Sequence, residues 1–505
     1  MKLAELAECV PGSRVLGDAA TEVARVVHDS RRVRRGDLFV ALVGTQVDGH
    51  RFVQAALEAG ASAAAVERAI GLPGNPPLLV VPDARQALGL LAQALAGFPT
   101  RKLIVCGITG TNGKTTTTYL ARGILEKSGR PTGLLGTIQY EMGERRIRSH
   151  MTTPDSTELA EYFAQMVEAG LKAAVMEVSS HALVQHRAAG IEFQVGAFTN
   201  LTPEHLDYHK DMPSYKQAKG LLFAGLSSEA WAVLNADDPA SQAFAESTPA
   251  KVLWYGLDHE AEVHAADVVT DLAGSRFTLT VPGGRIEART PLLGRHNVRN
   301  CLTAAAIGAA LGIAPETIAG GLEAVTVVRG RLEPVPTDRG FHVLVDYAHT
   351  ADALQNALGT VRHLVQGRLI VVFGCGGDRD RLKRPDMAAV AERLADRVIL
   401  TSDNPRSEDP AAIAAEAAKG FKRPRDVTVE LDRRAAIAVA LGEAQPGDVV
   451  IIAGKGHETY QETSQGIKPF DDRTVAQEIL SLQAAGTDET QAERNGAAGG
   501  AAGAP

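Results

Sequence analysis

The chain has 505 residues, 45% of them hydrophobic and 22% charged, a composition typical of globular proteins and a length that suggests about three domains. Its formal net charge of −8 argues against nucleic acid or an anionic membrane as the main partner. The four cysteines show no C-x-x-C spacing, and no apolar run reaches the roughly 20 residues of a membrane helix. The acidic N-terminal segment does not fit a signal peptide. We therefore expect a cytoplasmic protein with reduced thiols.

Residues 1–98 predict a first α/β domain. Short apolar runs at Leu38–Leu42, Ala63–Val66 and Leu78–Val81 are typical of buried strands, and a helical pattern lies at Val53–Ala59. Pro99 and Thr100 then interrupt the pattern.

A glycine-rich segment, Gly107–Thr116, follows the apolar run Leu103–Cys106 and precedes a helical pattern. Backbone N–H groups in such a loop point at phosphate oxygens, and the helix N-terminus adds partial positive charge. Lys114 is expected to reach the β- and γ-phosphates, and the Thr115 hydroxyl to bind Mg²⁺. The segment reads GxxGTNGKT, with Ile108 where the strict pattern has its first glycine. A glycine- and threonine-rich turn with a stray lysine is the alternative, which the flanking strand and helix disfavour.

The remaining chain alternates strands with helices, the rhythm of a parallel sheet covered on both faces. Residues 99–330 form the expected central domain, in which Val252–Leu293 suggests an antiparallel insertion. A second α/β unit is predicted over 331–483, with strands at Val343–Asp346, Arg368–Phe373, Val398–Leu400 and Val449–Ala453. Residues 484–505 are rich in Gly, Ala, Thr and Glu, and we expect a disordered tail there.

Three residues of the central domain are candidates for a metal or phosphate site. Glu177 closes a predicted strand, where a carboxylate near a phosphate loop can hold Mg²⁺; a helix N-cap is the alternative. His205 lies in the polar run Phe198–His209 and suits a metal, a phosphate or a structural hydrogen bond. Lys219 lies near a helix start, where the dipole disfavours a cation, so it either carries no positive charge or belongs to a solvated face.

Two polar clusters follow strands of the last domain, Phe373–Arg384 and Ser402–Arg406. Arg384 and Arg406 each offer a planar fork suited to a carboxylate. Pairing with local acids is the alternative, and spacing leaves both possibilities open.

Taken together, these segments resemble the Mur ligases, ATP-dependent amide-forming enzymes of peptidoglycan precursor synthesis. The resemblance extends to about residue 480, with Arg35 and Ala351 standing where proline is usual. It rests on motifs at Gly107–Thr115, Thr152–Pro154, Met176–His181, Asn200–Asp207, Gly294–Asn297, Arg331–Glu333, Asp346–His349, Asp403–Arg406 and Gly454–Glu458, and on His28–Arg31 with Gly36–Val40 in the first domain.

The resemblance implies an α/β fold of three domains: an N-terminal UDP-binding domain, a central P-loop ATPase with a parallel sheet, and a C-terminal Rossmann-like domain that binds the amino acid. It also implies that ATP phosphorylates the D-glutamate carboxylate of UDP-N-acetylmuramoyl-L-alanyl-D-glutamate, after which an amine attacks the acyl-phosphate. The amino acid implied is meso-2,6-diaminopimelate, whose distal carboxylate fits the Arg406 fork. Lysine would leave that fork unpaired at a cost of roughly 2–5 kcal/mol.

Individual roles carry over by position. The implied catalytic residues are Lys114, His205 and Lys219, the last as an N6-carboxylysine. The implied Mg²⁺ ligands are Thr115, Glu177 and Lys219. The implied ATP contacts are Gly110, Thr111, Asn112, Gly113, Lys114, Thr115, Thr116, Asn297, Arg331 and Asp346. The implied contacts to the UDP-linked dipeptide are Ser30, Thr45, Gln46, Val47, Thr152, Thr153, Ser179, Gln185 and Arg187. The implied amino-acid contacts are Arg384, Asp403, Asn404, Pro405, Arg406, Gly454 and Glu458.

The implied partners are small molecules only, and a monomer is expected. Folylpolyglutamate synthase shares the phosphate loop and the lysine, but it lacks the uridine domain and the Asp-Asn-Pro-Arg motif. A regulatory P-loop ATPase would need neither the uridine domain nor an amino-acid pocket.

Overall fold

The computed structural model describes residues 1–44 and 47–483. The chain forms two compact units. The first comprises Met1–Val268, Arg276–Thr290 and His296–Val325, and the second comprises Val269–Ser275, Pro291–Arg295 and the chain from Thr326 onward. The three-domain boundaries at 98 and 330 stay a prediction, and the expected tail, 484–505, lies outside the described residues.

The N-terminal part of the first unit contains a five-stranded sheet of order β1-β5-β4-β3-β2, in which only β1 pairs antiparallel. Alternate strand residues face opposite sides. Leu38 and Val40 pack under α3, whereas Phe39 packs on the α2 side. The elements are α1 (Leu3–Glu8), β1 (Arg14–Leu16), β2 (Arg25–Val27), η1 (Ser30–Arg32), β3 (Asp37–Val40), η2 (Gly49–Phe52), α2 (Val53–Glu58), β4 (Ala63–Val66), β5 (Leu78–Val80) and α3 (Ala84–Leu95).

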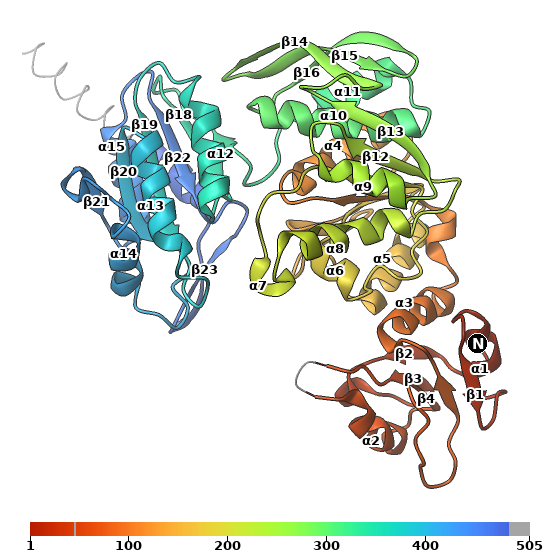
Figure 1. Cartoon of the computed structure of the whole chain (residues 1–505). Helices are drawn as coiled ribbons and strands as arrows, with labels where there is room; N and C mark the ends of the chain where they lie inside the picture. Colours follow the sequence, from red (N-terminus) through yellow and green to blue (C-terminus); the bar gives the residue numbers. More distant parts are fainter. Residues whose placement is uncertain (45–46, 484–505) are drawn as a thin grey trace, which may run out of the picture. The chain divides into compact units, whose positions relative to one another are not determined.

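The larger part of the first unit contains an eleven-stranded sheet of order β16-β15-β14-β13-β12-β11-β6-β10-β7-β8-β9 (Figure 1). Strand β6 lies in its interior and pairs in parallel with both β10 and β11. The strands are β6 (Ile104–Thr109), β7 (Thr132–Leu135), β8 (Gln139–Met142), β9 (Arg145–Arg148), β10 (Ala173–Glu177), β11 (Val195–Phe198), β12 (Trp231–Asn235), β13 (Lys251–Gly256), β14 (Val263–Asp271), β15 (Gly274–Val281) and β16 (Gly284–Thr290).

The segment Val252–Leu293, expected to be an antiparallel insertion, begins with parallel strands. Strand β13 pairs in parallel with β12, and β14 pairs in parallel with β13. The central parallel sheet therefore continues into a segment that its short alternating pattern assigned to an insertion.

Helices cover this sheet, and two of them, α4 and α8, contact the glycine-rich turn. They are η3 (Pro99–Lys102), α4 (Lys114–Lys127), α5 (Ser156–Glu168), α6 (Ser180–Val184), α7 (Leu206–His209), α8 (Met212–Ala224), α9 (Ala240–Ser247), α10 (Arg295–Ala310) and α11 (Pro315–Ala324). Helix α8 begins after Asp211, whose carboxylate accepts a hydrogen bond from Ser214 N at 2.8 Å. Such a cap satisfies one of the free N–H groups at a helix start.

The second unit contains a six-stranded sheet of order β17-β18-β22-β19-β20-β21. Only β17 pairs antiparallel. Its elements are β17 (Glu333–Val335), β18 (His342–Asp346), α12 (Ala351–Arg362), β19 (Leu369–Cys375), α13 (Lys383–Leu394), β20 (Arg397–Ser402), α14 (Pro410–Ala418), η4 (Pro424–Asp426), β21 (Val427–Val429), α15 (Arg433–Glu443) and β22 (Val449–Ala453), followed by a helical segment, 472–483.

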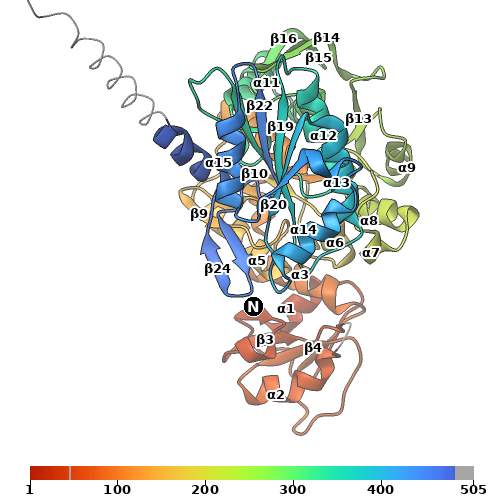
Figure 2. The ribbon, with the colours of Figure 1, turned by 90° about the vertical axis from the view of Figure 1, so that its left-hand side faces the viewer.

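Both faces of this second sheet are covered. Val371 packs on the side of α12, α13 and α14, whereas its neighbour Val372 packs on the side of α15. A separate hairpin of β23 (Tyr460–Thr463) and β24 (Gly466–Pro469) lies at one end of the sheet (Figure 2). The continuous apolar strands predicted from the sequence are thus strands buried on both faces. Among the described residues, no helix has the length and apolar character needed to cross a membrane.

A fully buried ion pair joins α15 to the last helical segment. Arg433 donates from Nε and Nη2 to the two carboxylate oxygens of Asp472, each at 2.7 Å, and both side chains are 0% exposed. Arg433 also donates to the carbonyls of Ser402 and Ala453, at 3.2 and 2.9 Å. The pair therefore ties α15 and the last helical segment to the ends of β20 and β22.

We predict that Asp472→Ala destabilises the second unit strongly, because it leaves the Arg433 guanidinium buried without its counter-ion. The expected loss in free energy of unfolding is about 3–5 kcal/mol, measured by urea denaturation. The control is Glu478→Gln, which removes the acid of an ion pair to Arg434 whose two side chains are 51% and 46% exposed. That change should cost less than about 1 kcal/mol. Equal losses in both variants would contradict the prediction.

Candidate active site

The turn between β6 and α4 requires glycine at two positions. Gly113 has φ 85° and ends the turn, and a Cβ there would lie 2.3 Å from Asn300 Oδ1. A Cβ on Gly110 would lie 1.8 Å from Thr199 Oγ1. A side chain at either position would clash and, at Gly113, also force a left-handed backbone that other residues rarely adopt.

The same turn is held from both sides. Lys114 folds back over it, and its Nζ donates to the carbonyls of Gly110 and Thr111 at 2.9 and 2.8 Å. Asn200, directly after β11, accepts from Thr111 N at 2.8 Å and from Asn112 N at 2.9 Å. A rigid glycine turn before a helix N-terminus, with a lysine above it, has the chemistry of a phosphate-binding loop.

Oxygen atoms converge beside this loop at the end of β10. The Glu177 carboxylate, 1% exposed, accepts from Thr115 Oγ1 at 3.1 Å and from Thr137 N and Oγ1 at 2.8 and 3.0 Å. Within 1–44 and 47–483 no group of three or more His, Cys, Asp or Glu side chains is placed to hold a metal ion. A Mg²⁺ ion here would therefore need hydroxyl, phosphate or modified-lysine oxygens as well, a donor set that this ion accepts.

Lys219 lies on α8 and is 1% exposed, so its assignment to a solvated face is wrong. Its Nζ donates to Gly110 O at 2.7 Å and lies 4.3 Å from the centre of the Tyr215 ring. Burial, and next the nearby charge of Lys114, hold the pKa of Lys219 well below its usual value. A lysine buried in this way favours the neutral amine.

Three histidines gather beside Lys219, of which the sequence analysis assigned only His205. His181 and His205 have ring centres 4.9 Å apart, and His209 Nε2 lies 2.9 Å from Ser180 Oγ. Burial lowers the pKa of His181 to about 4 and also lowers the pKa values of His205 and His209. All three are therefore neutral at pH 7. The density of polar and aromatic residues in Phe198–His209 is the signal that pointed to this region.

Most residues predicted to contact the UDP-linked dipeptide lie around the end of β10. Thr153 Oγ1 donates to Glu177 O at 2.9 Å and accepts from Ser179 N at 3.0 Å. Arg187 donates to Thr153 O at 3.0 Å and to Gln185 Oε1 at 2.7 Å. Thr152 lies in the same region, because its hydroxyl is 3.1 Å from the hydroxyl of Thr137, which is hydrogen bonded to Glu177.

The remaining predicted contacts of this group belong to the N-terminal sheet region. Ser30 opens η1, and Val47 is exposed. Thr45 and Gln46 lie outside the described residues, so their roles stay a prediction.

The predicted ATP contacts are divided between the two units. Asn297 belongs to the first, where its Oδ1 accepts from Asn300 Nδ2 at 2.9 Å. Arg331 and Asp346 belong to the second, where the Arg331 guanidinium lies 5.2 Å from the centre of the Tyr347 ring. Burial raises the pKa of Asp346, although its carboxylate accepts from two backbone N–H groups at 2.7 and 2.8 Å. That all three serve one nucleotide stays a prediction.

Four of the predicted amino-acid contacts meet at the end of β20. Asn404 Nδ2 donates to Glu458 Oε2 at 2.8 Å. Lys455, which the sequence analysis did not assign, is 0% exposed and donates to Asn404 Oδ1 and Glu458 Oε2, each at 3.0 Å. Gly454 has φ 115°, and a Cβ there would lie 2.5 Å from Asp403 Oδ2. The loop after β20 is thus packed directly against the loop after β22.

The two arginines of this region have different surroundings. Arg384 is 0% exposed and donates to Glu408 and Glu416, at 2.8 and 2.6 Å, so it has the local-acid partners that the sequence left as one possibility. Arg406 has φ 51° and donates from Nη1 to Gly377 O at 2.8 Å and from Nε to Glu462 Oε2 at 3.0 Å. Of the two, Arg406 is the side chain nearer to solvent, at 18% exposure.

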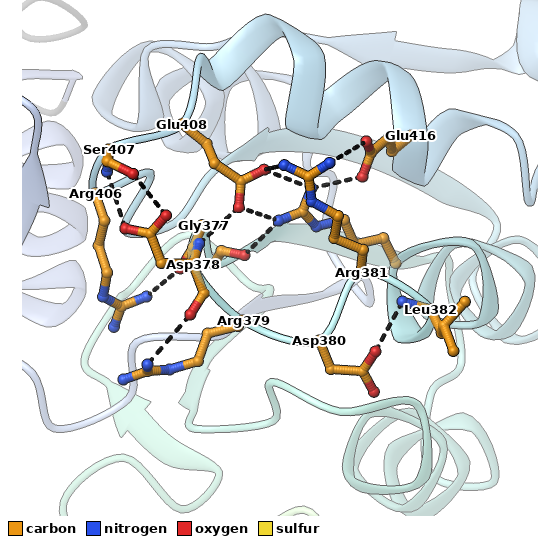
Figure 3. A network of polar contacts seen from close by, with 12 residues as sticks. Gly377, Asp378, Arg379, Asp380, Arg381, Leu382, Arg406, Ser407, Glu408 and Glu416 are labelled. Carbon is orange, nitrogen blue, oxygen red and sulfur yellow. Dashed lines mark hydrogen bonds and ion pairs between the residues drawn. The ribbon is translucent and has the colours of Figure 1, made fainter. Parts of the chain in front are cut away.

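Glu408 is the centre of the network around Arg384. Its carboxylate accepts from Arg384, from Arg381 Nη2 at 2.8 Å and from Asp378 N at 2.6 Å. The hydrogen bonds from Arg384 are the main cause that lowers the Glu408 pKa from 4.5 to about 2. The Asp378 carboxylate in turn accepts from Ser407 Oγ at 2.6 Å, which clamps the loop after β19 to the loop after β20 (Figure 3).

We predict that Glu408→Gln lowers the urea midpoint of the second unit in a pH-dependent way. A carboxylate with a depressed pKa stabilises the fold above its unfolded pKa and loses that effect as pH falls toward the folded pKa. The gap between wild type and Glu408→Gln should therefore be constant from pH 7 to about 5 and narrow below about 4.5. A gap that stays unchanged down to pH 3.5 would show that the clamp does not depend on this charge.

Comparison with known proteins identifies the family of this chain. The Mur ligase family, catalytic domain model matches residues 22–95, the Mur ligase middle domain model matches 108–308, and the Mur ligase, glutamate ligase domain model matches 330–456. A UDP-N-acetylmuramoyl-L-alanyl-D-glutamate–2,6-diaminopimelate ligase of Geobacillus kaustophilus is 46% identical over 484 residues, covering 94% of this chain and 98% of that protein.

Further relatives carry the same name. The enzyme of Geobacter metallireducens is 45% identical, covering 94% of this chain and 97% of its own. A solved structure of a UDP-N-acetylmuramoyl-L-alanyl-D-glutamate–2,6-diaminopimelate ligase superposes with a TM-score of 0.71 at 32% identity, covering 96% of this chain and 99% of that one. The predicted family and α/β fold are confirmed, and the chain belongs to the Mur ligase family.

Proposed function

We propose that this chain is an ATP-dependent ligase that adds meso-2,6-diaminopimelate to the D-glutamate of UDP-N-acetylmuramoyl-L-alanyl-D-glutamate. The observation that carries the substrate assignment is the side chain of Arg406. Its Nη2 has no hydrogen-bond partner among the residues that the structure describes, so one edge of a guanidinium fixed by Glu462 and Gly377 is open. Such an edge binds a carboxylate through two parallel hydrogen bonds.

The first step transfers the γ-phosphoryl group of ATP to the D-glutamate carboxylate, which turns a carboxylate oxygen into part of a leaving group. Lys114 and the N–H groups of the glycine turn bind the phosphates and offset their charge. Thr115, Glu177 and a carbamate on Lys219 would hold Mg²⁺, which when bound neutralises charge on the transferring group. His205, whose pKa is lowered by burial, would donate a hydrogen bond to a phosphate oxygen.

In the second step the uncharged amine of diaminopimelate attacks the acyl-phosphate carbon, the carbon–oxygen bond to phosphate breaks as the amide bond forms, and the proton lost from the amine goes to the departing phosphate. Asn404 and Glu458 hold the reacting end of the amino acid, and Arg406 holds its distal carboxylate. Most of the rate then comes from orientation and charge neutralisation. Thr152, Thr153, Ser179, Gln185 and Arg187 bind the dipeptide, and we expect the enzyme to act as a cytoplasmic monomer.

A second function, hydrolysis of ATP coupled to a protein partner, is tested by the same assay. Phosphate release without the UDP-linked dipeptide would favour that function, whereas release only with both co-substrates supports the ligase.

We predict that Lys219→Ala nearly abolishes phosphate release, because the neutral amine of Lys219 becomes a carbamate that supplies a metal-binding anion. Short-chain carboxylic acids should restore part of the activity, and added bicarbonate should not. In the wild type, ¹³C-labelled bicarbonate should give a carbamate carbon signal that the variant lacks. Full activity in Lys219→Ala would refute the role.

We predict that the wild-type enzyme prefers meso-diaminopimelate to L-lysine by about 10- to 150-fold in kcat/KM, the effect of roughly 1.5–3 kcal/mol from hydrogen bonds to a charged group. Arg406→Ala should lose most of this preference while changing the poor use of lysine little. The measurement is an amino-acid panel with ATP and the UDP-linked dipeptide, scored by phosphate release and product mass. Comparable efficiency for lysine and diaminopimelate in the wild type would refute the substrate assignment.

A further inference from the structure

Arg406 is fixed by two different acceptors. A guanidinium has five N–H donors. Nε donates to Glu462 Oε2 at 3.0 Å, and Nη1 donates to Gly377 O at 2.8 Å, the contact drawn in Figure 3. These two bonds set the plane of the fork and leave the Nη2 side open. One of the two acceptors is a carboxylate, so Arg406 already has a counter-ion without any substrate.

The counter-ion comes from the β23–β24 hairpin, which is docked onto the loop after β20. Glu462 N donates to Asn404 Oδ1 at 3.0 Å, and Arg406 N donates to Glu462 O at 3.0 Å. The neighbouring Gln461 donates from Nε2 to Asp403 O at 2.8 Å. Backbone and side chain of Glu462 are thus both tied to the Asp403–Arg406 loop. Its carboxylate is 38% exposed, compared with 18% for Arg406.

The backbone of Arg406 gives independent support for a functional contact. Its φ of 51° lies in the left-handed region, which costs free energy for a residue with a side chain. The strained conformation is held by the bond from Arg406 N to Glu462 O and by the bond from its Nη1 to Gly377 O. Strain of this kind persists where surrounding contacts over-determine it, as at ligand-binding sites.

We propose that Glu462 is a specificity-determining residue that acts as an internal carboxylate partner of Arg406 and weakens the enzyme's selection of a second carboxylate on the incoming amino acid. The inference rests on the proposed function, because it takes Arg406 to bind the distal carboxylate of diaminopimelate. In this proposal the Arg406 guanidinium binds the substrate carboxylate, and the negative charge of Glu462 reduces how strongly it does so.

The charge balance explains the direction of the effect. When lysine binds, Arg406 is still paired with Glu462, so lysine does not leave a bare guanidinium. The penalty of roughly 2–5 kcal/mol expected from the sequence therefore overstates the discrimination. When diaminopimelate binds, its distal carboxylate joins a guanidinium that is already paired with Glu462 and that also interacts with the charge of Asp378, so the like charges repel each other. Both effects lower the preference for diaminopimelate.

Glu462→Gln tests this account, because the amide retains an oxygen for the Nε–H bond and removes only the charge. The KM for diaminopimelate should fall about 3- to 10-fold, the effect of removing a like charge about 7 Å away in a half-exposed site. The value of kcat should stay within about twofold, and kcat/KM for L-lysine should not change. The preference for diaminopimelate over lysine should widen by the same factor, and the fall in KM should shrink at high salt.

Two further variants separate charge from structure. Glu462→Asp keeps the charge and should leave the KM for diaminopimelate within about twofold of wild type. Glu478→Gln removes one exposed acid elsewhere in the second unit and should change neither substrate. An unchanged KM in Glu462→Gln, a higher KM, or an equal change for lysine and diaminopimelate would overturn the role of Glu462. Failure of the wild type to use diaminopimelate would instead overturn the proposed function.

Discussion

The register of three parallel strands determines where the chemistry of the first unit lies. Glu177 of β10 pairs with Ile108 of β6, and Phe198 of β11 pairs with Thr109. Because the three strands end at the same edge of the sheet, the segments that follow them leave side by side. The glycine turn, the Glu177 carboxylate and Asn200 are therefore brought together, although Asn112 of the turn and Asn200 are 88 residues apart in the chain. A shift of one strand by a single residue would turn Glu177 to the opposite face.

This arrangement brings two lysines onto one backbone carbonyl and so favours loss of a positive charge or binding of an anion. Gly110 O accepts from both Lys114 Nζ and Lys219 Nζ, at 2.9 and 2.7 Å. Two ammonium groups on one carbonyl repel each other, and burial of Lys219 adds a desolvation cost. The neutral amine on Lys219 relieves the repulsion, and phosphate oxygens beside Lys114 would complete the balance. The site is thus arranged for negative charge before any substrate binds.

Local sequence patterns predicted much of this structure, and distant pairings account for what they missed. The glycine turn and the buried strands follow from apolar runs and backbone requirements within ten residues or so. The argument from the helix dipole predicted that Lys219 carries no positive charge. In the structure the main cause of its lowered pKa is instead burial, with Nζ hydrogen bonded to Gly110 O. Residue spacing did not reveal that Lys455 is fully buried. Nor did it show that β14 continues the parallel sheet, because strand direction depends on where the chain returns.

The two arginines after β19 and β20 show why sequence alone left their roles open. The acids that bind Arg384 lie 24 and 32 residues along the chain, and the acid that binds Arg406 lies 56 residues along. Arg384 is fully buried and paired with two carboxylates, so its charge serves to hold two loops together. The Glu462 carboxylate that is hydrogen bonded to Arg406 is exposed to solvent, and Arg406 Nη2 has no hydrogen-bond partner among the described residues, so the charge of Arg406 can be divided between the protein and a ligand. The two arginines therefore differ in how accessible their counter-ions are, a difference that residue spacing does not reveal.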